Sequence, residues 1–259
     1  MMLLSVVVPA YREKNIDQDI KKIEPVLKRM GCDYEIIVVD DGSGDGTFER
    51  ASLLESPTVK VFGYKKNRGK GYAVRFGMAR SRGDLVGFID AGTDIDPQGI
   101  AVLVEHLKRH RADAVIGSKY HPESQVGVGL KRKVLSLGTG LLVKILFGLN
   151  ISDTQAGVKV FRREVLERVL PRLLVKRWAF DIEVLAVAYH LGYRRIVEAP
   201  IKLAANLSSN VRVFGPNGIW QTLRDTLAIF YRLKILRYYD DKSKRKWVYD
   251  EGLEMRINV

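Results

Sequence analysis

The sequence predicts an α/β fold in which helices cover both faces of a mostly parallel sheet. Segments rich in Val and Ile recur at residues 3–8, 35–39, 58–62, 84–89 and 113–117, and the gaps between the early ones carry helical periodicity. Alternating strands and helices are typical of parallel sheets, because each parallel connection must cross over the sheet. The first two strands run into turn formers and carboxylates, so we expect polar groups at the carboxyl edge, where open α/β sheets bind ligands.

Composition limits the function without choosing it. The chain has 259 residues, 46% of them hydrophobic, which suits one large domain or one and a half ordinary ones. Its net charge of +13 predicts attraction to nucleic acid, phosphorylated ligands or an anionic lipid surface. The lone Cys32 cannot form an internal disulfide and the start of the chain has no secretory pattern, so a cytoplasmic protein is expected.

The first strand stops at Pro9, and a helix is predicted after the loop that follows. The helix should extend from Asn15 to Met30, with Asn15 as its cap and Gly31 as its end. Its apolar residues recur at helical spacing, so it should cover one face of the sheet. They are Ile16, Ile20, Ile23 and Leu27.

The second strand, Ile36 to Val39, leads directly into Asp40 and Asp41 and then a glycine-rich turn. A carboxylate at this position can accept hydrogen bonds from a ribose or a base, and the glycines let a ligand approach the backbone. An Asp-Asp-Gly segment is also an ordinary turn or helix cap. The place after a buried strand favours the binding interpretation.

Residues 67–71, Asn-Arg-Gly-Lys-Gly, precede another predicted helix. Backbone donors, the helix dipole and two cations would converge there, which predicts an anion site. The spacing is not that of the P-loop, because the Gly-x4-Gly-Lys-Ser/Thr pattern is missing. Read alone, the segment also fits a solvated turn.

The fourth strand ends in an acidic segment that contains Asp90, Asp94 and Asp96. Closely spaced carboxylates suit Mg²⁺ or Mn²⁺ bridging a diphosphate, and such an ion would neutralise charge on a departing nucleotide. Asp96 stands before Pro97, so it also fits a helix cap.

The second half of the chain has a different pattern. Residues 119–133 are rich in turn formers and basic residues, and a helix-like stretch then runs to about Gly148. A strand at 158–161, a helix at 180–190 ending at Gly192 and a strand leading to Pro200 follow. Asp153 to Gly157 and Trp178 to Glu183 place polar groups among apolar ones, which fits either core packing or a site.

Residues 219–239 predict a basic amphipathic helix. Trp220, Leu223 and Leu227 lie opposite Gln221 and Arg224 on a helical wheel. The helix either packs on the protein core or lies on a membrane surface, with aromatic side chains at headgroup depth and basic ones near lipid phosphates. The run at 242–246 is expected to be a solvated charge run unless lipid is present. No segment reaches the ~20 apolar residues that span a bilayer.

Taken together, these segments resemble the family 2 glycosyltransferases of the GT-A fold, and among them the dolichyl-phosphate and other polyprenyl-phosphate glucosyl- and mannosyltransferases. The resemblance covers about residues 4–215, which predicts a catalytic domain at 1–215 and a C-terminal part at 216–259. Any one segment is weak evidence, whereas the ordered set is strong. The matching segments are 7–13 (Val-Val-Pro-Ala-Tyr-Arg-Glu), 37–43 (Ile-Val-Val-Asp-Asp-Gly-Ser), 67–71, 90–96, 117–120, 153–157 with Lys159 and Phe161, and 177–183.

The resemblance implies a role for individual residues. Asp90, Asp153, Asp181 and Lys119 would be catalytic, with Asp90 opening the metal motif and Asp181 supporting the sugar pocket. Pro9, Tyr11, Glu13 and Asp41 would surround the nucleoside, and Lys70 would lie near the diphosphate. Lys119, Lys131 and Arg132 would bind the lipid phosphate, and Asp153 and Gln155 would line the sugar pocket. Trp178 would also bind substrate.

Two departures from the family pattern bear on this assignment. The family usually has Asp-x-Asp where this chain has Asp90, Ala91 and Gly92, so we expect Asp90 and Asp94 to share the Mg²⁺ or Mn²⁺ ion. Relatives often carry a basic residue after the serine near 208–210, and Arg212 is expected to substitute for it. Relatives also often carry transmembrane helices, and none is predicted here.

The resemblance implies inverting transfer of a hexose, from UDP-glucose or GDP-mannose, to a polyprenyl or dolichyl phosphate. The expected location is the inner face of the membrane, as a peripheral protein with no nucleic-acid partner. A soluble or polysaccharide hydroxyl acceptor is the alternative, and it would need a general base such as Asp153 or Asp181. A non-catalytic basic binding protein is a third hypothesis. The sequence leaves open the sugar, the base, the lipid and the oligomeric state, with a family-level preference for glucose.

Overall fold

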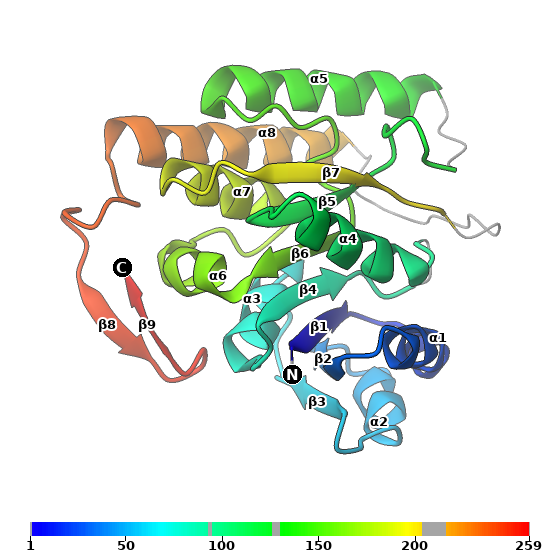
Figure 1. Cartoon of the computed structure of the whole chain (residues 1–259). Coiled ribbons are helices and arrows are strands. Elements are labelled where there is room, and N and C mark those ends of the chain that lie inside the picture. Colours follow the sequence, from blue (N-terminus) through cyan, green and yellow to red (C-terminus); the bar gives the residue numbers. More distant parts are fainter. Residues whose placement is uncertain (1, 93–94, 126–129, 204–215, 259) are drawn as a thin grey trace.

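The computed structural model describes residues 2–92, 95–125, 130–203 and 216–258 (Figure 1). For 130–136 and 216–217 it describes the backbone, and for the other described residues also the side chains. A seven-stranded sheet forms the centre, and β6 is antiparallel to both of its neighbours while the other pairs are parallel. The predicted α/β fold with a mostly parallel sheet is therefore confirmed. The strand order is β3 (Val59–Gly63), β2 (Asp33–Asp40), β1 (Leu3–Ala10), β4 (Leu85–Ile89), β6 (Val158–Arg162), β5 (Ala114–Ser118), β7 (Ile196–Pro200).

The strand register brings the chemically interesting loops to one edge. Ala10 at the end of β1 pairs with Asp40 at the end of β2, and Val7 pairs with Phe88 of β4. Asp41 and Asp90 therefore leave the sheet on the same side. Since β6 runs the opposite way, the segment before it, 153–157, reaches this edge too.

Two apolar cores lie on opposite faces of the sheet. Val6 and Val8 of β1 face one core and Val7 faces the other, because successive strand residues point to opposite faces. The first core includes α1 (Ile16–Arg29), α2 (Thr47–Ser52) and α4 (Gln98–Arg109). The second includes α3 (Lys70–Arg80), α5 (Leu130–Phe147), α6 (Arg163–Val169), η1 (Leu170–Arg172), α7 (Phe180–His190) and α8 (Pro216–Phe230).

Helix α1 follows the prediction closely. It begins after Asn15 and ends one residue before Met30, and Gly31 has φ +65°, a left-handed conformation that suits a helix end. Asn15 occupies the cap position, although no side-chain hydrogen bond caps this described helix. Helix α7 ends likewise near Gly192, at φ +101°.

The C-terminal part folds onto the second core. After α8 comes a turn of π-helix, η3 (Tyr231–Ile235), and then a hairpin of β8 (Trp247–Asp250) and β9 (Met255–Asn258), which lies beside α3 and α6 (Figure 1). Tyr239, Leu253 and Ile257 belong to the same core cluster as α7. Sequence reasoning missed the hairpin, because its four-residue strands carry little apolar alternation. The division at residue 215 stays a prediction.

Helix α8 buries a different stripe from the one the helical wheel makes most apolar. Thr226 and Ile229 are buried, as is Leu233 in the following η3, whereas Trp220 is 70% exposed and Leu227 48% exposed. The 242–246 run is largely exposed, as expected, except that Arg245 donates hydrogen bonds to two backbone carbonyls. Among the described helices, none is long and apolar enough to cross a bilayer.

Candidate active site

Four charged side chains form a network at the carboxyl edge of the sheet. Lys70 Nζ lies 2.8 Å from Asp90 Oδ2 and 3.5 Å from Asp181 Oδ2. Lys159 Nζ lies 2.5 Å from Asp181 Oδ1 and donates to the Ala156 carbonyl at 2.7 Å. The network joins α3, the loop after β4, α7 and β6, which places the predicted residues Lys70, Asp90 and Asp181 together.

Burial and pairing determine the protonation of this network. Burial opposes the charged form of Lys70, but Asp181 and Asp90 outweigh it and raise the pKa of Lys70. Burial likewise opposes the charge on Asp181, yet Lys159 and Lys70 lower the pKa of Asp181. Burial raises the pKa of Asp90 and lowers that of Lys159. Asp181 is thus held as a carboxylate and is a weak base.

Asp90 has a feature that suits a cation. Its Oδ1 is buried and accepts no hydrogen bond within the described chain, while Oδ2 pairs with Lys70. Gly157 adjoins it closely, since a Cβ on this glycine would overlap the Asp90 carboxylate. An unsatisfied carboxylate oxygen fits a hard divalent ion. Asp94, the expected second ligand, lies outside the described residues.

Glycine at position 92 has a local explanation. Gly92 has φ +96°, where an aspartate would be strained, and a Cβ there would lie 3.2 Å from Glu13 Oε2. Its amide donates to Asp19 Oδ2 at 2.8 Å. No three described His, Cys, Asp or Glu side chains form a metal-binding group. Of the two predicted metal ligands, Asp90 is the one that lies among the described residues.

Asp41 holds the 64–69 segment in place. Its carboxylate accepts hydrogen bonds from Tyr64 Oη (2.8 Å), Asn67 Nδ2 (2.9 Å) and the Gly69 amide (2.9 Å), with the Arg68 amide at 2.7 Å. Burial raises the pKa of Asp41, and these donors act against that shift. The geometry gives Asp41 a role in shaping the turn before Lys70, and its contact with a nucleoside stays a prediction.

The other predicted nucleoside residues line the same edge. Pro9 is the second-last residue of β1. Tyr11 follows the end of the strand and is 46% exposed. The Arg12 guanidinium stacks 5.3 Å from the Tyr11 ring centroid, and the Arg12 amide donates to Ser43 Oγ at 2.8 Å. The ends of β1 and β2 are thereby tied together. Glu13 is half-buried beside Gly92.

A second ion pair lies farther along the edge. Lys119 Nζ is 3.3 Å from Asp153 Oδ2, and the Lys119 amide donates to the same oxygen at 3.1 Å. Glu198 of β7 accepts from the Asp153 amide at 3.1 Å and from Ser152 Oγ at 2.7 Å. The structure thus brings two predicted site residues, Lys119 and Asp153, into contact.

The remaining predicted residues are less well placed by the structure. Gln155 is half-buried in the segment before β6, and Trp178 is 37% exposed beside the start of α7. The side chains of Lys131 and Arg132 lie outside the described residues, as does Arg212. Asp96 Oδ1 accepts from the Gln98 amide at 2.9 Å at the start of α4, which agrees with a helix-capping role.

Three residues that matter here were not predicted as site residues. Lys159 is fully buried, and its signal in the sequence is a lysine within an apolar strand, Val158 to Phe161. Glu198 and Asp19 carry no local signal, because each acts on a loop distant in sequence. Burial raises the pKa of Asp19 to about 6.

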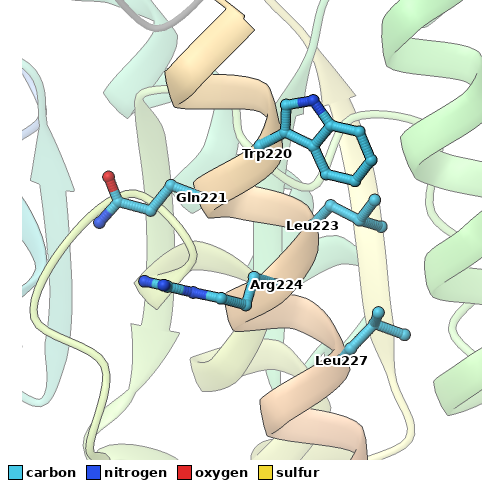
Figure 2. A pocket seen from close by; sticks show the side chains of 5 residues that line it. All are labelled: Trp220, Gln221, Leu223, Arg224 and Leu227. Atoms are coloured by element: carbon cyan, nitrogen blue, oxygen red, sulfur yellow. The ribbon is translucent and has the colours of Figure 1, made fainter.

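Apolar side chains are exposed on two neighbouring helices, α5 and α8. Trp220, Leu223 and Leu227 lie on one side of α8, and Gln221 and Arg224 lie on the other side (Figure 2). These five residues line an open groove of about 580 Å³. Helix α5 lies alongside α8 (Figure 1), with the rings of Phe147 and Phe230 6.3 Å apart.

Helix α5 has a pocket of its own. It has a volume of about 340 Å³ and is lined by α5 side chains including Leu137, Leu141 and Lys144. Ser152 and Glu198 also line it, and Glu198 accepts a hydrogen bond from the Asp153 amide. Through Glu198 the pocket adjoins the Lys119–Asp153 pair. Ile145 on the same helix is 71% exposed.

Comparison with known proteins identifies relatives for most of the chain. Residues 5–170 match the model of the family described as "Glycosyl transferase family 2". A dolichyl-phosphate beta-glucosyltransferase of Dictyostelium discoideum is 36% identical over 73% of this chain and 63% of its own length. The human dolichyl-phosphate beta-glucosyltransferase is 38% identical over 71% and 62%. The chain thus spans slightly less than two thirds of these relatives.

A further relative is matched over more of its length, and a solved structure shares the fold. Dolichyl-phosphate beta-glucosyltransferase ALG5A of Trichomonas vaginalis is 32% identical over 89% of this chain and 74% of its own length. Glucosyl-3-phosphoglycerate synthase of Mycobacterium tuberculosis, solved with Mn²⁺, UDP and glucosyl-3-phosphoglycerate, superposes with a TM-score of 0.67 at 22% identity. The match covers 100% of this chain and 87% of that one.

Proposed function

This chain belongs to glycosyl transferase family 2, and from that membership we propose that it transfers a hexose from a nucleotide sugar to a polyprenyl or dolichyl phosphate. We propose UDP-glucose as the donor in preference to GDP-mannose. The relatives are dolichyl-phosphate beta-glucosyltransferases. The fold neighbour was solved with UDP.

The observation that carries the proposal is the placement of two lysines at the carboxyl edge of the sheet, one of them near a pocket that apolar side chains help to line. The resemblance implies that Lys70 lies near the donor diphosphate, and Lys70 contacts Asp90. Lys119 lies beside Asp153, near the pocket that Leu137 and Leu141 of α5 line together with polar side chains. An acceptor with an anionic head and a hydrocarbon tail suits this combination of charge and apolar surface.

The electrostatics favour a phosphate acceptor. A phosphate is already anionic near neutral pH, so it needs orientation and charge compensation more than a base. A phosphate oxygen would attack the anomeric carbon in line, and the bond from that carbon to the diphosphate would break. The nucleoside diphosphate would leave, and the configuration at the anomeric carbon would be inverted. Lys119, with Lys131 and Arg132, would orient the attacking phosphate.

The site also suits a divalent ion on the donor side. Asp90 would hold Mg²⁺ or Mn²⁺ through its unpartnered Oδ1, with Asp94 as the proposed second ligand. When bound, such an ion would neutralise charge on the departing diphosphate. Lys70, held next to Asp90, adds a positive charge at the same place.

The exposed faces of α5 and α8 support a location on the membrane surface. Trp220, Leu141 and Ile145 expose 70%, 59% and 71% of their area, which is unusual for large apolar side chains. A net charge of +13 would add attraction to anionic lipid headgroups. We propose that these helices rest on the cytoplasmic face of the membrane that contains the acceptor.

The test is a transfer assay on the purified full chain. UDP-glucose or GDP-mannose is supplied with Mn²⁺ and a polyprenyl phosphate in detergent, and label in the organic phase is measured. We expect transfer from UDP-glucose, with the anomer opposite to that of the donor. If neither donor is consumed, the acceptor assignment fails. Asp90→Ala should abolish metal-dependent donor hydrolysis, and a non-catalytic binding protein would show no such hydrolysis at all.

A soluble or polysaccharide hydroxyl is the alternative acceptor. It would need Asp153 or Asp181 as a general base, but both carboxylates pair with lysines, and the pKa of Asp181 is lowered against the effect of its burial. A weak base disfavours this reaction. The alternative gains support if glucose is transferred to a soluble acceptor and the full chain does not float with anionic liposomes.

A further inference from the structure

The C-terminal extension reaches into the support of the candidate site through one buried hydrogen bond. Tyr239 Oη donates to Glu183 Oε1 at 2.6 Å, and both side chains are fully buried. Glu183 is on α7, two residues after Asp181. A residue from the end of the chain thereby contacts the helix that supplies a charge to the site.

Glu183 in turn holds the 173–179 loop, the segment between η1 and α7. The Leu174 amide donates to both Glu183 oxygens, at 3.1 and 3.0 Å, and the Val175 amide donates to Oε2 at 2.8 Å. Arg75 Nη1 donates to the Leu173 carbonyl at 2.8 Å. The start of this loop is thus fixed by buried side chains of α7 and α3.

The other end of the loop touches the turn that presents Lys70. The Tyr72 amide donates to the Lys176 carbonyl at 3.1 Å. A Cβ on Gly69 would overlap that same carbonyl, so the two backbones are in close contact. Trp178, predicted to bind substrate, follows in the same loop. A displaced loop would therefore move Trp178 and the Lys70 turn together.

The extension is itself anchored where Tyr239 enters the core. Arg172 Nε donates to the Tyr239 carbonyl at 3.0 Å. Arg245 Nη1 donates to the Tyr238 carbonyl at 3.2 Å and to the Arg172 carbonyl at 3.3 Å. Tyr239 is thus fixed at its backbone as well as its hydroxyl, as a positioning contact requires.

We propose that Tyr239 and Glu183 are positioning residues: through their hydrogen bond, the C-terminal extension holds the 173–179 loop against the Lys70 turn in the geometry that binds the donor. The consequence for catalysis rests on the proposed function, whereas the positioning of the loop does not. A single hydroxyl near the end of the chain then tunes donor affinity from outside the donor site.

The test uses Tyr239→Phe in the full chain, which removes the hydroxyl and keeps the ring. Losing one hydrogen bond to a buried carboxylate should speed amide exchange in the 173–179 loop about tenfold, since such a bond is worth about one decade in an opening equilibrium. Hydrogen exchange read by mass spectrometry should show the increase there and not in β1 or β4. Tyr249→Phe is the matched control, because Tyr249 lies on the same extension and is 62% exposed. It should change amide exchange neither in the 173–179 loop nor in the core strands.

Two further measurements separate positioning from mere stability. The dissociation constant for UDP, measured by calorimetry, should rise in Tyr239→Phe by the factor by which the ordered fraction of the loop falls, which is at most about tenfold, because only the ordered fraction binds. Glu183→Gln should give the same local pattern and replaces Tyr239→Phe if that variant does not fold. Unchanged exchange in the loop, or a uniform increase over the core strands, would overturn the inference. Absence of UDP binding to the unmodified chain would refute the proposed donor. The exchange result would then still decide whether the Tyr239–Glu183 hydrogen bond positions the 173–179 loop.

Discussion

At the scale of residues, the main feature is a buried pair of opposite charges. Lys159 and Asp181 are 0% and 2% exposed and lie 2.5 Å apart. A buried ion pair adds little net stability, but removing one partner leaves the other charge without compensation. The pair is therefore better suited to fixing the position of Asp181 than to stabilising the fold, and Lys70 completes the compensation.

Substituting one partner should reveal this dependence. Asp181→Asn leaves Lys159 buried without its counter-charge and should lower the free energy of unfolding by about 3–5 kcal/mol. Lys159→Met should cost less, because Lys70 still faces Asp181. Urea unfolding at pH 7 measures both. Since the folded-state pKa of Asp181 is lowered, its contribution is present above its unfolded pKa and is lost as the pH falls through the folded pKa. Equal losses in the two variants would contradict this account.

Asp19 should produce the opposite pH dependence. Burial raises its pKa from 3.8 to about 6, so the folded state binds the proton more tightly than the unfolded chain. Stability should therefore fall as the pH rises from about 4 to 6, by about 1–2 kcal/mol after allowance for solvent screening. In Asp19→Asn this part of the pH dependence should vanish, as judged by urea midpoints at pH 4, 5 and 8. A variant that keeps the slope of the unmodified chain would exclude Asp19 as its source.

At the scale of elements, α8 presents its apolar residues on two sides. Ile229 packs into the core, as does Leu233 in the following η3, while Trp220 and Leu227 remain exposed. A helix that only covers a core has one apolar stripe and a polar remainder. The second stripe of α8 thus needs another explanation, and the proposed contact with a membrane surface would supply one.

The exposed stripe can be tested by removing it. Trp220→Ser with Leu227→Ser should reduce binding to anionic vesicles about a hundredfold or more, because each large apolar side chain that enters the interface contributes about 1.5–3 kcal/mol. Sedimentation with phosphatidylglycerol vesicles measures the change. Leu53→Ser is the matched control, since Leu53 is 84% exposed but lies at the end of α2. No loss in the double variant would mean that charge alone drives binding, and an equal loss in the control would mean that the effect is not specific to α8.

At the scale of the whole molecule, the chain closes on itself. The β8–β9 hairpin is only two strands, which are marginal in isolation, and its docking on α3 holds it. Arg80 donates to the Gly252 carbonyl at 3.1 Å, pairs with Glu254 at 2.5 Å and stacks 3.6 Å from the Phe76 ring centroid. One side chain of the sheet domain thus fastens the end of the chain.

Arg80→Ala should loosen this closure. Loss of the stacked guanidinium and its hydrogen bonds should lower the free energy of unfolding by about 1–2 kcal/mol and expose residues 247–258 to protease. Limited proteolysis, followed by mass spectrometry, locates the first cuts. Arg82→Ala is the control, because Arg82 pairs with Glu35 on the sheet and does not contact the hairpin. First cuts elsewhere in the Arg80 variant would refute the role assigned to it.

The sequence predicted those features that depend on interactions between residues close together in the chain. Strand periodicity and turn formers act locally, and they correctly predicted the α/β fold, α1, and the loops after β1, β2 and β4. The family was likewise recognised from ordered local segments. The hairpin, the side of α8 that packs on the core and the roles of Lys159 and Glu198 could not be predicted this way, because each depends on contacts made across the fold.

The sequence by itself determined which chemical groups this protein carries and at which strand ends they stand, because hydrophobic periodicity and turn residues specify local structure. Only the tertiary structure decided which groups meet. Lys70 reaches Asp181 across 111 residues, and Tyr239 reaches Glu183 across 56. Such pairings depend on strand order and on the antiparallel course of β6, and a chain's local pattern does not contain them because burial and charge compensation are properties of the packed whole.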